Sequence, residues 1–154
     1  MIERDWSIVL ATFVYCIGSA VIPVMHAEAY LITVSALTPP ALAWALVLAA
    51  TAGQMVGKVA MYWAGRGALR LPSERMRRRL AAVRARYEGH RGVGNGLIFV
   101  SASSGLPPFY VIAVVAGMLR VPLRSFVSFG TAGRFLRFTV AVFLPHLIKR
   151  TFGG

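Results

Sequence analysis

The chain has 154 residues, of which 57% are hydrophobic and only 14% are charged. A soluble domain of this length usually carries about 25% charged residues, so the composition argues against a soluble fold and indicates a single-domain integral membrane protein, residues 1–154. The net charge is +12, and arginine supplies 15 of the 17 basic residues. Because these residues concentrate between hydrophobic segments, they follow the positive-inside pattern, and we expect no nucleic-acid partner.

The first hydrophobic stretch covers residues 6–37, which is too long for one helical span and too short for two. The segment before it, Met1 to Asp5, is not basic, which argues against a cleaved signal peptide. Pro23 interrupts the stretch, and a proline within a helix removes a backbone donor and clashes with the preceding turn. We therefore predict a re-entrant hairpin, which enters and leaves the membrane on the same side.

Glu28 is the only acidic residue within a hydrophobic stretch. A lone carboxylate is costly to bury in lipid, so it should be paired, protonated or in contact with water. One interpretation is a site that titrates protons or responds to lipid headgroups, with Pro23 and His26 beside it. The alternative is a carboxylate that is solvated near the outer interface.

The second stretch, residues 40–65, has the length of a single span. Gly53 and Gly57 form a GxxxG motif, for which close helix packing is the default interpretation. Lys58 lies toward the end of this span, and we expect its long side chain to snorkel to the interface rather than to line a site.

The polar region at residues 66–92 holds nine arginines against Glu74 and Glu88, a net charge of +7 (9 − 2). The positive-inside rule predicts that this region is cytoplasmic. Leu80 and Val83 share one helical face, so an amphipathic helix at the interface is expected. Our preferred interpretation is that the region sets the topology and binds anionic lipid. The expected interfacial contacts are Lys58, Arg66, Arg77, Arg78 and Arg79.

The third stretch, residues 95–119, contains a polar passage near its start, from Ser101 to Pro108. This passage ends in two prolines and should break the helix. Such a break is tolerated at membrane depth only inside protein or beside water, so a second re-entrant hairpin is predicted. Its polar groups either face a ligand or are satisfied within the break. The candidate residues are Ser101, Ser103, Ser104, Pro107 and Pro108.

The fourth stretch, residues 123–148, again fits one span. Arg134 and Arg137 are three residues apart and therefore share a helix face. One interpretation is a cationic lining that holds phosphate and pairs with Glu28, since guanidinium grips phosphate through two hydrogen bonds. The alternative is snorkelling to the cytoplasmic interface.

The predicted fold is thus all-α, with two re-entrant hairpins, two or more transmembrane helices and an amphipathic cytoplasmic helix. The halves, residues 1–65 and 93–154, run in opposite directions, and an inverted repeat of broken helices is typical of transporters. Enzyme signatures and metal-ligand spacings are absent from the sequence, and Cys16 is its lone cysteine, so no enzymatic activity, metal or cofactor is expected.

Four passages within residues 21–138 resemble the DedA family of VTT-domain membrane proteins, nearest its small YqaA-type branch. They are Pro23 to Glu28 with Leu31, the pattern from Gly53 through Tyr62 to Gly65-Arg66, Arg91 to Met118, and Phe126 to Phe138. Ala27 replaces the family's glycine, and Lys58 stands where many members have an acid or Asn. Larger members also carry an Arg pair in the second hairpin, where this chain has serines and prolines.

The resemblance implies re-entrant hairpins that meet in the membrane and a lipid transporter or scramblase. Its substrates would be phospholipids or polyprenyl phosphates of the inner membrane, with proton linkage left open. Glu28 corresponds to the acid of the family's first hairpin. Two other functions stay open: a membrane organiser that binds anionic lipid or a partner protein, and a small proton-coupled solute transporter. Self-association of the chain stays open as well.

Overall fold

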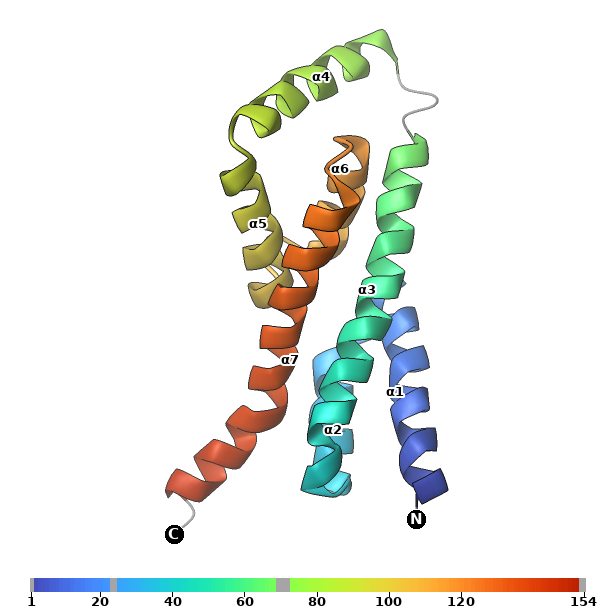
Figure 1. Ribbon diagram of the computed structural model, residues 1–154, viewed down its shortest axis with the longest axis vertical. Helices are drawn as coiled ribbons and strands as arrows, with labels where there is room; N and C mark the ends of the chain where they lie inside the picture. The colour runs from blue at the N-terminus through green and yellow to red at the C-terminus, as the bar shows by residue number, and fades with distance from the viewer. Residues whose placement is uncertain (1, 23–24, 69–72, 153–154) are drawn as a thin grey trace. The chain divides into compact units, whose positions relative to one another are not determined.

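The computed structural model describes residues 2–22, 25–68 and 73–152, and every element within them is a helix (Figure 1). The all-α class predicted from the sequence is therefore confirmed for the described chain. In order, the elements are α1 (Ile2–Val21), α2 (Ala27–Leu37), the 3-10 helix η1 (Pro40–Leu42), α3 (Ala43–Ala68), α4 (Glu74–Gly89), α5 (Arg91–Ser104), α6 (Phe109–Met118) and α7 (Leu123–Phe152).

Two of these helices are long and apolar enough to cross a membrane. They cover Pro40–Gly67, with 28 residues, and Leu123–Pro145, with 23 residues. Both match predicted spans, and at about 1.5 Å per residue each exceeds the ~30 Å hydrocarbon core. Large apolar side chains such as Trp6, Leu37 and Leu106 lie exposed on the surface. Exposed apolar surface of this kind suits lipid as the solvent.

The chain divides into two compact units. The first comprises Met1–Gly57 and Arg134–Gly154, and the second comprises Lys58–Gly133. Each unit holds one pair of helices separated by a break: α1 and α2, with 20 and 11 residues, in the first unit, and α5 and α6, with 14 and 10 residues, in the second. We call these pairs the first hairpin and the second hairpin.

In the first unit, the two arms of the first hairpin contact each other through aromatic and hydroxyl groups. The rings of Tyr15 and Tyr30 stack with centroids 4.1 Å apart, and the hydroxyls of Thr12 and Tyr30 lie 3.3 Å apart. Helices α2, α3 and α7 then enclose an apolar core with α1. Its buried residues are Cys16, Ala27, Leu31, Ala43, Leu46, Val47, Ala50, Phe138 and Val142.

The GxxxG motif of α3 packs directly on α1. A Cβ atom at Gly53 would collide with the carbonyl oxygen of Phe13, and one at Gly57 would collide with the side chain of Ala20. The two backbones therefore approach more closely than any larger residue would allow. This contact agrees with the packing role expected for the motif.

In the second unit, α6 packs on the C-terminal part of α3 in the same way. A Cβ atom at Gly65 would meet the carbonyl of Val114, and one at Gly117 would meet the carbonyl of Tyr62. The Tyr62 hydroxyl donates a hydrogen bond of 2.5 Å to the carbonyl oxygen of Val121. Close backbone contacts thus join α6 to α3, and a buried hydrogen bond joins α3 to the chain just after α6.

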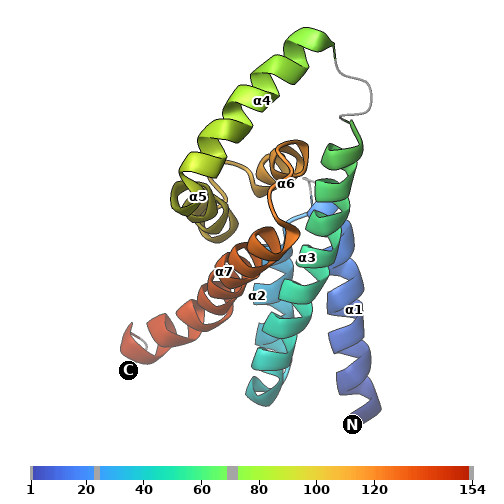
Figure 2. The ribbon, with the colours of Figure 1, turned by 45° about the horizontal axis from the view of Figure 1, so that its top comes forward.

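The basic region predicted at residues 66–92 is largely helical. It contains the end of α3 and the whole of α4, which is the helix expected around Leu80 and Val83. His90 caps α4 with its backbone N–H, and its carbonyl accepts hydrogen bonds from Val93 and Gly94 at the start of α5. Helices α4 and α5 therefore meet at a hydrogen-bonded elbow, visible in Figure 2.

Candidate functional site

A three-residue charge cluster lies in the first unit. The Nε–H of Arg137 donates a hydrogen bond of 2.5 Å to Oε1 of Glu28. Nη1 of Arg134 lies 3.8 Å from the same oxygen. The three residues that the sequence analysis singled out for their charge within the membrane are thus brought together around one carboxylate oxygen.

The local sequence explains this geometry. Glu28 lies in the first turn of α2, directly after the break that ends α1, where a helix favours negative charge. Arg134 and Arg137 are three residues apart on α7, so both side chains leave the same face. The helix break thus places the acid at a helix start, and the arginine spacing directs two cations to it.

The cluster is partly shielded from its surroundings. The side chains of Glu28, Arg134 and Arg137 are 29%, 10% and 27% exposed. Partial burial next to the apolar core strengthens the attraction between the charges and raises the cost of separating them. Two guanidinium groups and one carboxylate leave a net charge of +1 (2 − 1). Such a cluster can accept a monoanionic group such as a phosphodiester, provided that the carboxylate yields part of its contacts.

Of the two residues expected beside Glu28, Pro23 lies outside the described residues. His26 is the N-cap of α2 and makes no side-chain capping hydrogen bond. With Tyr30 and Thr33, it lines an open cavity of about 560 Å³ on the first hairpin. His26 therefore faces a space on the hairpin surface, at the end of α2 that carries Glu28.

The serines of the second break bond to the backbone of the break itself. Ser101 donates a hydrogen bond of 2.5 Å to the carbonyl of Pro107. Ser104 donates to the carbonyl of Val100 at 2.6 Å and accepts the backbone N–H of Leu106 at 3.1 Å. These bonds favour the interpretation of a satisfied helix break over that of a ligand-facing one.

The other two residues of the break passage differ in their surroundings. Ser103 donates a hydrogen bond of 3.2 Å to the carbonyl of Val100, one turn earlier in α5. Pro108 is the N-cap of α6 and, like Pro107, is exposed. The tip of the second hairpin therefore exposes both prolines and Ser104, and the hydroxyls of its serines bond to the backbone.

Lys58 differs from the snorkelling side chain that the sequence predicted. It is buried, and its Nζ lies 5.9 Å from the centroid of the Tyr110 ring. The apolar span runs to Gly67, which lies about 14 Å along the helix beyond Lys58. The lysine side chain is too short to cover that distance and reach the end of the span. Its cation instead lies against an aromatic ring.

Of the remaining expected interfacial residues, Arg66 lies in the last turn of the apolar helix α3, and the other three lie in the polar helix α4. The guanidinium of Arg66 lies 5.2 Å from the centroid of the Trp63 ring and donates to the Tyr62 hydroxyl at 3.3 Å. The three consecutive arginines of α4 are exposed, as a surface role requires: Arg77, Arg78 and Arg79.

One buried polar pair was not singled out from the sequence. The side-chain amide of Gln54 donates a hydrogen bond of 2.7 Å to the Ser19 hydroxyl, which donates to the carbonyl of Cys16 at 3.0 Å. Gln54 is the only glutamine in the sequence and lies in the middle of a predicted span, a signal that would have marked it. The pair ties α3 to α1 beside the GxxxG contact.

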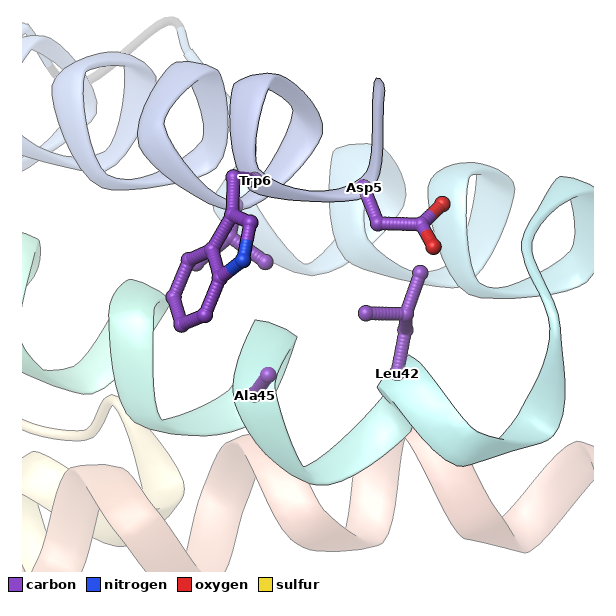
Figure 3. A pocket seen from close by; sticks show the side chains of 5 residues that line it. Asp5, Trp6, Leu42 and Ala45 are labelled. Atoms are coloured by element: carbon purple, nitrogen blue, oxygen red, sulfur yellow. The ribbon is translucent and has the colours of Figure 1, made fainter. Parts of the chain in front are cut away.

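A small pocket of about 250 Å³ opens between the start of α1 and the start of α3 (Figure 3). Trp6 and Asp5 come from α1, while Leu42 and Ala45 lie on the opposite wall. The pocket has one carboxylate in an otherwise apolar lining. Across the described chain, no three His, Cys, Asp or Glu side chains gather in a way that would hold a metal ion.

Comparison with known proteins gives one match. The family model described as the VTT domain matches residues 22–147. No curated protein and no solved structure gives a significant match. The matched range includes Glu28, Arg134 and Arg137 together with both helix breaks.

Proposed function

The chain belongs to the DedA family of VTT-domain membrane proteins, and on that basis we propose that it moves lipid headgroups between the leaflets of the inner membrane. The substrates are lipids with a phosphate in the headgroup, either phospholipids or polyprenyl phosphates. The observation that carries this proposal is the cluster of Glu28 with Arg134 and Arg137. The cluster offers a cationic site within the membrane, and in the resting state the Glu28 carboxylate occupies it.

In this proposal, the headgroup phosphate exchanges places with the Glu28 carboxylate. Arg134 and Arg137 hold one carboxylate oxygen in the resting state, and a phosphate presents the same kind of acceptor. A phosphate entering the cluster would take over guanidinium hydrogen bonds, and the returning carboxylate would release it. Protonation of Glu28 would favour the phosphate-bound state, which is how a proton gradient would act on the cycle.

The lengths of α2 and α6 support re-entrant hairpins. These helices have 11 and 10 residues, or roughly 16 and 15 Å, about half of the ~30 Å hydrocarbon core. An inserted helix of that length ends inside the membrane, where the chain turns back. Two such hairpins in an inverted repeat, residues 1–65 and 93–154, would leave polar groups at membrane depth on a path for headgroups.

The charge distribution supports an orientation with the 66–92 region in the cytoplasm. In that orientation, Thr38 to Pro40 and the start of α1 lie on the outer side. The helices α3 and α7 are then the two full spans of a multi-pass inner-membrane protein.

Transfer of fluorescent lipids in proteoliposomes tests the proposal. Arg137→Gln removes the guanidinium with the short bond to Glu28, and Arg134→Gln removes the second one. We expect each to slow transfer of anionic phospholipid by about tenfold or more, because one charge-assisted hydrogen bond is worth ~1.5–3 kcal/mol. Arg124→Gln is the matched control, since it removes an exposed arginine from the same helix.

Equal transfer by the wild type and by both cluster variants would overturn the proposal. A chain that binds anionic vesicles without any leaflet exchange would instead be a membrane organiser. Thermal unfolding of each variant in detergent distinguishes loss of the site from loss of the fold.

A further inference from the structure

The helix α4 carries an apolar stripe along one face. Met76, Leu80, Val83 and Tyr87 follow one another at intervals of four, three and four residues, so they line up along the helix at ~100° per residue. Met76 and Val83 are 47% and 50% exposed, and no residue of α4 is fully buried. Within the second unit, two of the four stripe residues are therefore exposed, and the other two, Leu80 and Tyr87, are partly exposed.

Arginines border the stripe on both sides. By the same geometry, Arg77 and Arg84 lie along one edge, and Arg75, Arg79 and Arg86 lie along the other, all within roughly 110° of the stripe. The opposite face holds Ala81, Ala85 and Arg78, so Arg78 lies away from the stripe, although the sequence predicted an interfacial contact for it. The helix has six arginines and two glutamates, a net charge of +4 (6 − 2). An apolar stripe between two cationic edges is the pattern of a helix that lies in the interface of an anionic membrane.

Tyr87 fixes the direction in which the stripe faces. Its hydroxyl donates a hydrogen bond of 3.0 Å to Oδ1 of Asn95 in α5, and its ring fills the space where Gly94 lacks a Cβ atom. Burial raises the pKa of Tyr87, so the hydroxyl stays protonated and remains a donor. Because Tyr87 belongs to the stripe and contacts α5, the stripe faces the side of α4 from which α5 departs (Figure 2).

Other helices lie a few residues from both ends of α4: an apolar span precedes it and α5 follows it. The span Pro40–Gly67 ends seven residues before Glu74, and α5 begins two residues after Gly89. A tethered helix meets the bilayer surface at a high effective concentration, so modest affinity per residue is enough to hold it there. Anionic headgroups complement the cationic edges, while acyl chains complement the stripe.

We propose that α4 docks on the surface of an anionic leaflet, with Met76, Leu80 and Val83 in the acyl-chain boundary and the flanking arginines on headgroup phosphates. Tyr87 acts as a positioning residue that sets the roll of the helix. This role is separate from transport at Glu28, and it holds whether or not the chain moves lipid.

Site-directed spin labelling of the full chain in vesicles tests the proposal. The background is Cys16→Ala, which removes the only native thiol. Val83→Cys places a label in the stripe, and Ala85→Cys is the matched control at an exposed position on the opposite face. In vesicles containing phosphatidylglycerol, we expect the label at position 83 to be accessible to oxygen but shielded from a polar nickel chelate. The label at position 85 should collide freely with the chelate and less often with oxygen.

Charge variants test whether the edge arginines bind α4 to the anionic membrane surface. Arg79→Gln combined with Arg86→Gln removes two edge arginines, and we expect a roughly thirtyfold shift toward the undocked state. Arg78→Gln removes a charge from the opposite face and should cause a much smaller shift. Tyr87→Phe should reduce the difference between positions 83 and 85, because the roll of the helix is no longer fixed.

Equal exposure of positions 83 and 85 to the chelate in anionic vesicles would overturn the proposal. Shielding of position 83 from both oxygen and the chelate would also overturn it, since a protein surface would then cover the stripe. Docking that is equally strong in pure phosphatidylcholine would refute the role of the arginines.

Discussion

The two hairpins differ in how the polar groups near their helix breaks are satisfied. Each consists of two helices separated by a break, and the sequence has a proline in each break. The first hairpin carries a carboxylate at its break, and two arginines from α7 neutralise it. The second has no charged residue between Ser101 and Met118, and its serines bond to the backbone of the break.

This difference separates a site that can change partners from one that is closed. An ion pair is held by groups from distant parts of the chain, and either partner can be exchanged for a ligand of like charge. A hydroxyl that satisfies its own helix break has a structural partner a few residues away. We therefore expect the first hairpin to bear function and the second to depend on packing.

The largest effect should come from the packing of the second hairpin. Gly117→Ala places a methyl group against the carbonyl of Tyr62, and neither backbone can yield easily. We expect about 3 kcal/mol of destabilisation, measured by chemical unfolding in detergent micelles. Gly96→Ala in α5 is the control, because nothing lies within 4 Å of the added atom. It should be neutral or stabilising by up to ~1 kcal/mol.

The ion pair of the first hairpin should show a smaller but specific coupling. A double-mutant cycle with Glu28→Gln and Arg137→Gln isolates the pair, and we expect about 1–3 kcal/mol because the groups are partly shielded. Arg84 and Glu88 on α4 form an exposed pair at 3.1 Å, which provides a matched cycle. That pair should couple by less than about 0.5 kcal/mol.

Equal coupling in the two cycles would remove the distinction drawn between the hairpins. It would mean that Glu28 and Arg137 are as solvated as a surface pair. That result would favour the alternative interpretation of Glu28, a carboxylate that is solvated near the outer interface.

Local features of the sequence were enough to predict the helices. Pro23 indicated the first break, Gly105 with Pro107 and Pro108 indicated the second, and hydropathy marked both spans to within a few residues. The spacing of Arg134 and Arg137 placed them on one face. Each of these features depends on neighbours along the chain, and helix geometry translates them directly into structure.

Contacts between distant residues could not be derived in the same way. Glu28 and Arg137 are 109 positions apart, so charge alone suggested their pairing without fixing which arginine makes the short bond. The burial of Lys58 depends on how far the span continues and on the position of Tyr110. Hydropathy treats a lysine near the end of a span as interfacial and carries no information about a neighbouring ring.

The smallest predicted effect tests whether the second break is purely structural. Ser101→Ala removes the hydrogen bond to the carbonyl of Pro107 and leaves that acceptor without its hydroxyl partner. We expect a loss of about 1 kcal/mol in stability and lipid transfer within about twofold of the wild type at temperatures where the variant is folded. Ser104→Ala should cost less, since its hydroxyl is exposed. If Ser101→Ala instead stopped transfer while unfolding was unchanged, the second hairpin would contribute to the lipid path, and its polar groups would have to open toward a ligand during the cycle.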